Sequence, residues 1–522
     1  MKEGRWLAWL LAASLAAGFA LAALDGKGFS AAGVAGYTLL LAASVAGLLW
    51  VGRRGLADPA PRTVLLLAIA TLAMRLGFGL LLARGLPAWG YDEKVQRAGY
   101  VFWDAFKRDA DSWQRGRGDV PLLASFTHPK SSDQYGGLLF LSAGVYRYLS
   151  GGVQRPLMIV VLTAAASAFA LLFIWGFAHT GLGPAAGRAA AWIALLAPEA
   201  VLLGASQMRE PFLIAGLAMS LYGYVLVPAR GARPGVAWIL AGMALLLFFS
   251  PPTALAGAAA LAILSLWEGR ARARLPRWLW WTAVPFALVG LGLAIQSWAH
   301  LEELRGSFGS ILIQWWQNAG AAWRVGQAAA SSDQIEIVLN KIPVVAQLPF
   351  LVAYGLVQPF LPAAIAAPGN ALWKTIAVWR GLGWFALLPL LVYGSIAAWR
   401  RNGWRSLAVY LAFLVWTSAV IASYRAPGYQ WDNPRYRTVF LVAQAGLAGW
   451  AWASARALRD PWLGRAYVTT ALVTAVLLSW YIGRYANLPS LSLEGTLAGA
   501  LLAAAAYLGA CLVWDRRRRR AA

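Results

Sequence analysis

The sequence predicts an all-α integral membrane protein that crosses the bilayer many times. Of its 522 residues, 60% are hydrophobic and only 13% are charged, a composition far more apolar than that of a soluble domain. Apolar runs of about 18 residues or more recur along the whole chain, and each can cross the roughly 30 Å hydrocarbon layer as a helix. No soluble domain of useful size remains between these runs.

Fourteen apolar runs are candidate transmembrane helices. They lie near residues 5–24, 31–51, 63–83, 156–178, 188–205, 211–228, 235–249, 253–267, 278–297, 375–398, 406–423, 438–455, 466–483 and 496–514. Two further apolar stretches, 134–150 and 343–366, are too short or are broken by prolines, which remove helix hydrogen bonds. We expect both to lie at the outer interface without crossing. The first run resembles a signal peptide, but further spans follow at once without a convincing cleavage site, so we expect an anchor.

Basic clusters at the ends of the apolar runs predict the orientation of the spans. The clusters are Arg53 with Arg54, Arg230 with Arg233, Arg270 to Arg277, Arg400 to Arg405, Arg456 to Arg465 and Arg516 to Arg520. Such clusters mark the cytoplasmic side, and all of them lie there only if neither doubtful stretch crosses. We then expect a plasma-membrane protein with both termini in the cytoplasm. The expected outer loops are 85–155, 206–210, 298–374 and 424–437.

The charge and the rare residue types exclude several classes of function. The net charge of +24 comes from clusters suited to orientation and to contact with membrane lipids, so we expect no nucleic-acid partner. The three histidines are scattered, and no spacing resembles a zinc site. We therefore predict no metal ligands, although outward acids leave a divalent metal possible. The chain has no Gly-rich phosphate loop, GxSxG or kinase signature, so a donor must arrive already activated.

The first long outer loop is the most polar stretch and begins with Asp92 and Glu93. Apolar residues at helical spacing follow, with charged residues between them, which predicts an amphipathic helix on the membrane surface. A carboxylate at this depth can act as a general base toward an acceptor hydroxyl. The alternative is that the two acids only cap the helix and complement its dipole. The loop ends in a polar group that includes His128, Lys130 and Tyr135.

Two other outer loops carry charges. Arg209 and Glu210 open a span, where a charge is costly unless it faces an interior or a cavity. Alternatively they form an ion pair that anchors the helix end. The loop YRAPGYQWDNPRYR places Arg435 and Arg437 outside, against the positive-inside trend. Guanidinium groups match phosphate oxygens in bidentate fashion, so this loop suits a lipid phosphate headgroup, with generic anionic-lipid contact as the alternative.

The order of these elements resembles the C-type family of lipid-linked, multi-spanning glycosyltransferases, which includes protein O-mannosyltransferases and aminoarabinose transferases. A span leads to an outer loop with GYDEKVQRAGY, a second outer acid follows in SQMREPFLIAGLAMSLY, and DNPRYRTVFLV precedes a later span. The resemblance covers about residues 63–440, which we expect to form the catalytic membrane domain. Residues 1–62 add two N-terminal spans, and residues 441–522 add C-terminal spans and a basic cytoplasmic tail.

The resemblance implies a GT-C-like fold and an inverting transfer of a sugar from a polyprenyl phosphate donor. The acceptor is a hydroxyl of a glycan, lipid or protein on the outer face. Asp92 maps onto the family's catalytic base, with Glu93 beside it, and Glu210 maps onto its second acid. The residues expected to bind the donor phosphate or substrate are Arg209, Arg435, Tyr436, Arg437, His128, Lys130 and Tyr135. THPKSSDQY stands where the family usually has Lys-Pro-Pro or His-Pro-Pro.

Two other functions remain alternatives. An outer-face polysaccharide ligase or polymerase would use a polyprenyl diphosphate donor, and a non-enzymatic transporter would need paired broken helices at the bilayer midplane. The charged residues instead gather at one face, which favours an enzyme. We also expect Asp92 and Glu210 to approach a common cavity, because two separate charges at the lipid interface are hard to justify.

Overall fold

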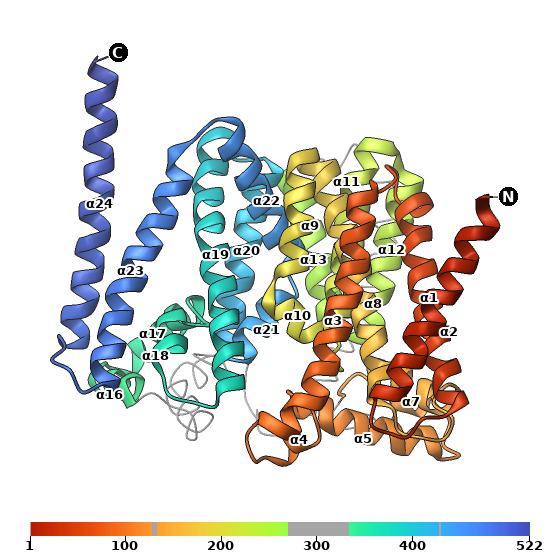
Figure 1. The fold of residues 1–522 in the computed structure, drawn as a ribbon. Coiled ribbons are helices and arrows are strands. Elements are labelled where there is room, and N and C mark those ends of the chain that lie inside the picture. The colour runs from red at the N-terminus through yellow and green to blue at the C-terminus, as the bar shows by residue number, and fades with distance from the viewer. Residues whose placement is uncertain (1, 128–132, 270–332, 427–429, 522) are drawn as a thin grey trace. The chain divides into compact units, whose positions relative to one another are not determined.

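The computed structural model describes residues 2–127, 133–269, 333–426 and 430–521 (Figure 1). Within these ranges, nine helices are long and apolar enough to cross a membrane, or up to eleven if each of two bent helix pairs is one span. The predicted fold class, an all-α polytopic membrane protein, is confirmed. The predicted count of fourteen spans is not, and the run at 278–297 lies outside the described residues.

The chain divides into two compact units. Unit 1 comprises residues 1–305, 405–411 and 438–449, and unit 2 comprises residues 306–404, 412–437 and 450–522. The predicted domain boundaries after residues 62 and 440 stay predictions.

Unit 1 contains the first helices of the chain. They are α1 (Lys2–Leu24), α2 (Ala31–Trp50), η1 (Val51–Gly55), α3 (Arg62–Trp89), α4 (Lys94–Arg97), α5 (Trp103–Arg117), α6 (Ala124–Thr127), α7 (Gly137–Tyr148), α8 (Pro156–Leu182), α9 (Pro184–Leu196), α10 (Pro198–Gly204), α11 (Glu210–Arg230), α12 (Ala232–Phe249) and α13 (Pro251–Trp267). Proline occupies the first turn of α8, α9, α10, α11 and α13, where its missing N–H has no cost.

The centre of unit 1 is α8, which packs against α2, α3, α9 and α11. In the most apolar stretch of α8, 89% of the residues are buried. Beside it, α11 and α12 approach each other through glycines: a Cβ on Gly216 would lie 2.9 Å from the Gly242 carbonyl oxygen. Small residues let membrane helices come this close, because packing rather than hydrophobicity holds helices together in lipid.

The predicted span at 188–205 is two helices, α9 and α10, bent by 56°. Arg75 of α3 is buried at this break and donates to the Ala194 carbonyl oxygen (2.9 Å). A break in a membrane helix leaves carbonyl groups without helical partners, and buried polar groups in lipid must find one. Arg75 therefore supplies a hydrogen-bond donor to a carbonyl group at the break.

The two ends of unit 1 differ in charge and in structure. At one end, Arg230 pairs with Asp58, and the Trp238 indole N–H donates to the Gly55 carbonyl oxygen (3.2 Å), so two of the basic clusters lie together. At the other end α4, α5 and α7 lie across the ends of the long helices (Figure 1). Arg147 of α7 donates to the carbonyl oxygen of Arg115 (2.8 Å), which holds α7 along α5. The side of the membrane that each end faces stays a prediction.

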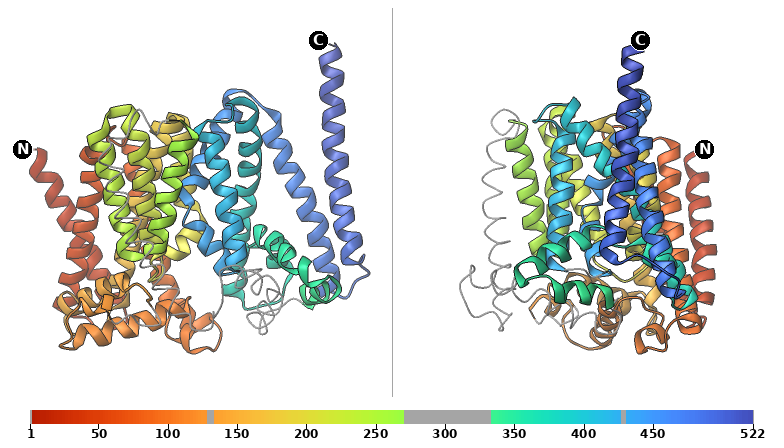
Figure 2. Two further views of the ribbon diagram at one scale, coloured as in Figure 1. Left: turned by 180° about the vertical axis from the view of Figure 1, so that it is seen from behind. Right: turned by 90° about the vertical axis from the view of Figure 1, so that its left-hand side faces the viewer.

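Unit 2 contains most of the remaining helices. They are α16 (Asp333–Lys341), α17 (Val344–Leu356), α18 (Leu361–Ala366), α19 (Ala371–Arg401), α20 (Leu407–Arg425), α21 (Asp432–Thr438), α23 (Pro461–Tyr485) and α24 (Leu493–Ala521), with the start of α20 and the last residue of α21 in unit 1. The remaining helix, α22 (Leu441–Ala457), is divided between the two units after Gly449. At one end Arg401 pairs with Asp460, and Arg465 binds both oxygens of Asp515 (2.6 and 2.7 Å). Figure 2 shows α23 and α24 as an antiparallel pair, in blue.

Candidate active site

Asp92 lies at the surface of unit 1, directly after α3. The helix ends at Trp89, and the Gly90 N–H donates to the Leu86 carbonyl oxygen (2.8 Å). The Asp92 side chain is 80% exposed and pairs with the guanidinium of Arg97. The hydrogen bond from Arg97, together with its charge, lowers the pKa of Asp92. The carboxylate is therefore ionised at neutral pH, as a proton acceptor must be.

Glu93 precedes a single helical turn, α4, and makes no side-chain cap bond to it. The chain then turns at Gly99, which has a φ of +82°. A Cβ on Gly99 would lie 2.7 Å from the Ala83 carbonyl oxygen, so the backbone passes directly against α3 here. The prediction of one continuous surface helix is wrong, because this close approach interrupts it between α4 and α5.

The buried face of α5 is polar. Its buried residues share one face of the helix and are Ala105, Arg108, Asp109, Ser112 and Gly116. Trp103, by contrast, is 58% exposed. Arg108 is one of the charged residues that lie between the apolar positions of this stretch, and the sequence pattern did not indicate that it is buried. Periodicity separates two faces of a helix, but it does not show which one has buried polar partners.

Arg108 links α5 to the chain just before α11. Its guanidinium donates to the Gln207 carbonyl oxygen (3.0 Å) and lies 4.0 Å from the Asp133 carboxylate. Both side chains of this ion pair are buried. Burial lowers the pKa of Arg108, while Asp133 and Glu210 oppose this shift and Arg209 adds to it. The charges of these residues from three parts of the chain thus act on one another.

Glu210 begins α11 and is 2% exposed. A carboxylate in the first turn of a helix is favoured by the helix dipole. The guanidinium of the preceding Arg209 lies 5.0 Å from the centre of the Tyr135 ring. Two predicted substrate-binding residues, Arg209 and Tyr135, are therefore in contact beside the predicted second acid.

Asp109 is a further buried acid that sequence reasoning missed. The Tyr100 hydroxyl donates to it (2.8 Å), as do the Tyr146 hydroxyl and the Gln154 amide. Burial raises the pKa of Asp109, although its hydrogen bonds act in the opposite direction. Asp109 follows Ala105 by one helical turn, and this shared periodicity was a signal that could have indicated its burial.

Arg435 and Arg437 belong to unit 2. Arg437 is buried, lies 3.4 Å from the centre of the Trp384 ring and donates to the Gln358 carbonyl oxygen. Arg435 is 6% exposed, and its guanidinium lies 3.7 Å from the Asp432 carboxylate. Both predicted phosphate ligands are thus held inside the protein rather than extended into solvent.

Two more arginines continue this arrangement. Arg425 lies 4.6 Å from the Tyr436 ring, which also contacts Arg435 (5.7 Å). Arg380 of α19 lies 4.0 Å from the Trp431 ring and donates to the Gln430 carbonyl oxygen (2.9 Å). We call Arg380, Arg425, Arg435, Arg437 and their aromatic partners the arginine cluster. Sequence reasoning missed Arg380, although a basic residue inside the apolar run at 375–398 was a signal.

Apart from Asp92 and Glu93, the predicted site residues that the structure describes form two groups. Glu210, Arg209 and Tyr135 lie together in unit 1, whereas Arg435, Tyr436 and Arg437 lie together in unit 2. A common cavity for Asp92 and Glu210 stays a prediction. His128 and Lys130 lie outside the described residues. Among the residues that are described, no group of three or more His, Cys, Asp or Glu side chains could hold a metal ion.

No family model and no curated protein sequence matches the chain. Among solved structures it is similar to the archaeal oligosaccharyltransferase AglB from Archaeoglobus fulgidus in complex with an inhibitory peptide and a dolichol-phosphate, with 14% identity and a TM-score of 0.38. It is also similar to the apo form of the Archaeoglobus fulgidus oligosaccharyltransferase, with 15% identity and a TM-score of 0.38. Both matches cover 84% of this chain and 54% of the other, so this chain spans about half the length of those proteins.

Proposed function

We propose that this chain transfers a sugar from a polyprenyl phosphate donor to an acceptor hydroxyl at the outer face of the membrane. The observation that carries the proposal is the arginine cluster, in which Arg435 and Arg437 are buried and rest on aromatic rings. Guanidinium groups bind phosphate oxygens in bidentate fashion, and stacking on a ring fixes the guanidinium plane. A surface that only attracts anionic lipids would not need buried arginines.

In this proposal Asp92 is the general base. Its exposure allows an acceptor to reach it, and its pKa, which Arg97 lowers further, leaves it ionised at neutral pH. A carboxylate with a lowered pKa is also a weak proton acceptor. The acceptor hydroxyl would therefore have to displace Arg97, which would restore the proton affinity of Asp92. Glu93 and Glu210 would supply the neighbouring negative charge that orients the acceptor.

The reaction would be a direct displacement with inversion at the sugar carbon. The acceptor oxygen forms the new bond while Asp92 takes its proton, and the bond from the sugar carbon to the phosphate oxygen breaks. The polyprenyl phosphate leaves with the bonding electron pair. The acceptor is a hydroxyl of a glycan, a lipid or a protein.

Binding of radiolabelled polyprenyl monophosphate to the purified protein in nanodiscs tests the donor assignment without knowledge of the sugar. Arg380→Ala should weaken the binding of polyprenyl monophosphate about ten- to a hundredfold, because it removes charge-assisted hydrogen bonds worth about 1.5–3 kcal/mol. Arg400→Ala is the matched control, because Arg400 is an exposed arginine on the same helix. Equal binding by Arg380→Ala and wild type, or equal competition by phosphatidylglycerol, would refute a polyprenyl phosphate site.

The ligase alternative is tested by the same measurement. The arginine cluster carries enough positive charge for a diphosphate, so polyprenyl diphosphate is included as a competitor. Tighter binding of the diphosphate than of the monophosphate would favour the ligase. Transfer is then measured from radiolabelled polyprenyl phosphate hexoses and pentoses into membranes that contain the protein.

A further inference from the structure

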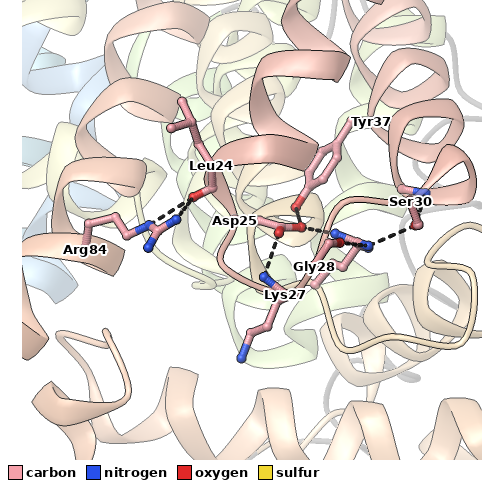
Figure 3. Close-up of polar contacts among 9 residues, drawn as sticks. Leu24, Asp25, Lys27, Gly28, Ser30, Tyr37 and Arg84 are labelled. Carbon is pink, nitrogen blue, oxygen red and sulfur yellow. Dashed lines mark hydrogen bonds and ion pairs between the residues drawn. The ribbon is translucent and has the colours of Figure 1, made fainter.

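A buried ion pair fastens the N-terminal helical hairpin, α1 and α2, to the rest of unit 1. Asp25 lies in the loop of this hairpin and pairs with Arg155, which precedes α8, and both side chains are fully buried. Figure 3 shows that the Tyr37 hydroxyl also points to the Asp25 carboxylate, to which it donates (3.3 Å). Arg155 donates in addition to the Gly28 carbonyl oxygen (2.7 Å) and to the Ser30 hydroxyl (3.0 Å).

The hairpin also touches the backbone that joins α7 to α8. A Cβ on Gly36 of α2 would overlap the Leu149 carbonyl oxygen, and a Cβ on Gly33 would lie 2.7 Å from the Arg155 guanidinium carbon. The approach at Gly36 needs glycine, because any side chain there would push α2 and the Leu149 backbone apart. The position of residues 149–155 therefore depends on the hairpin.

The same linker holds the polar end of unit 1. Gln154, next to Arg155, donates to Asp109 on the buried face of α5. The carbonyl oxygen of Pro156, on the other side of Arg155, accepts from the Gln207 amide (3.1 Å). Gln207 in turn accepts from Arg108 through its own carbonyl oxygen (3.0 Å). Gln154 and Pro156, the residues before and after Arg155 in sequence, thus contact residues that hold α5 and the start of α11 in position.

We infer that the N-terminal hairpin is a positioning element for the polar end of unit 1, with Asp25 and Arg155 as the positioning residues. Without Asp25 the Arg155 guanidinium is an uncompensated buried charge, which is strongly unfavourable. Arg155 would then move toward water and carry Gln154 and Pro156 with it. The buried face of α5 would open to solvent. This role of the hairpin goes beyond the proposed function and does not depend on it.

The test measures how often α5 opens. Ser112, fully buried on that face, is replaced by cysteine in a Cys511→Ser background, and the rate of its reaction with a water-soluble maleimide is recorded in nanodiscs. Asp25→Asn should raise this rate at least about tenfold, because the fraction of time that a segment is open controls its reactivity. Arg84→Gln is the matched control. Arg84 ties the hairpin to α3 through the Leu24 carbonyl oxygen (3.0 and 2.9 Å) and does not touch Arg155.

A second variant gives an independent test that leaves both charges in place. Gly36→Ala pushes the Leu149 backbone away from α2, and it should raise the Ser112→Cys rate in the same direction. Each variant is compared only as a monodisperse fraction from size-exclusion chromatography. An unchanged rate in the folded form of either variant would overturn the inference. An equal rise in Arg84→Gln would assign the effect to general loosening of the hairpin and would also overturn the role of Asp25 and Arg155.

Discussion

Two of the aspartate–arginine pairs of unit 1 have the same chemistry and opposite surroundings. The side chains of Asp92 and Arg97 are 80% and 64% exposed, whereas those of Asp25 and Arg155 are fully buried. In water an ion pair contributes little stability and exchanges partners easily. A buried pair cannot lose one member without leaving the other charge uncompensated. The exposed pair is therefore suited to chemistry, and the buried pair is suited to holding structure.

The largest expected effect is the loss of transfer activity when Asp92 of the exposed pair is replaced. If Asp92 is the base, Asp92→Asn should reduce transfer from a polyprenyl phosphate sugar by the roughly 10²- to 10⁴-fold attributed to general base catalysis. Its thermal midpoint should change little, because the side chain is exposed. Asp119→Asn, an exposed acid in the same loop, is the control. Near wild-type transfer by Asp92→Asn would remove the catalytic assignment and leave the fold unaffected.

The next largest expected effect is the loss of protein stability when Asp25 of the buried pair is replaced. Asp25→Asn should lower the free energy of unfolding in detergent by about 3–5 kcal/mol, the usual loss when one partner of a buried ion pair is removed. Thermal unfolding followed by tryptophan fluorescence measures this change. If Asp25→Asn unfolded at the same temperature as Asp92→Asn, the buried pair would contribute no more to protein stability than the exposed pair.

A double replacement should sharpen the comparison. Asp25→Leu combined with Arg155→Met removes both buried charges, and well-packed apolar residues often replace such a pair without loss. We expect the double variant to recover about 2 kcal/mol or more relative to Asp25→Asn. The recovery should be incomplete, because Gly28 and Ser30 lose the hydrogen bonds from Arg155. A double variant less stable than Asp25→Asn would contradict an uncompensated Arg155 as the cause.

The smallest effect concerns pH. Arg97 lowers the pKa of Asp92, so in Arg97→Gln this pKa should rise toward its ordinary value. Less of the Asp92 carboxylate is then ionised in acid, and the acidic limb of the pH–rate profile of transfer should move to higher pH. Lys94→Gln, which removes a nearby charge that does not bind Asp92, should move it less. An acidic limb that stays in place in Arg97→Gln would indicate that another group controls it.

Much of the fold follows from the sequence, because a long apolar run in lipid has to form a helix. Within the described residues every predicted span corresponds to a helix or to a bent helix pair. Pro198 was a signal for the bend between α9 and α10, since a proline interrupts a helix at the preceding residue. The break at Gly99 was harder to predict, because it depends on a contact with Ala83 in another helix.

The candidate site was less predictable, for the same reason. Glu210 and Arg437 stood out because charges and prolines interrupt apolar sequence around them. The buried role of Arg108 was not visible, since its partners Asp133 and Gln207 lie elsewhere in the chain. Asp25 and Arg155 are 130 residues apart, so neither indicates by itself that they form a pair. The partner of a buried charge is a property of the packing, so the sequence does not identify it.

The contact between Arg75 and the break after α9 also imposes an order on biosynthesis. Arg75 enters the membrane 119 residues before Ala194, which supplies its closest carbonyl acceptor. At roughly 5–20 residues per second the ribosome takes on the order of ten seconds to make the intervening chain. During that time α3 carries an arginine whose insertion at a helix centre costs about 2.5–3.5 kcal/mol. We therefore expect α3 to remain beside the translocation machinery until α9 follows, so that the first helices of unit 1 are released into lipid as a group.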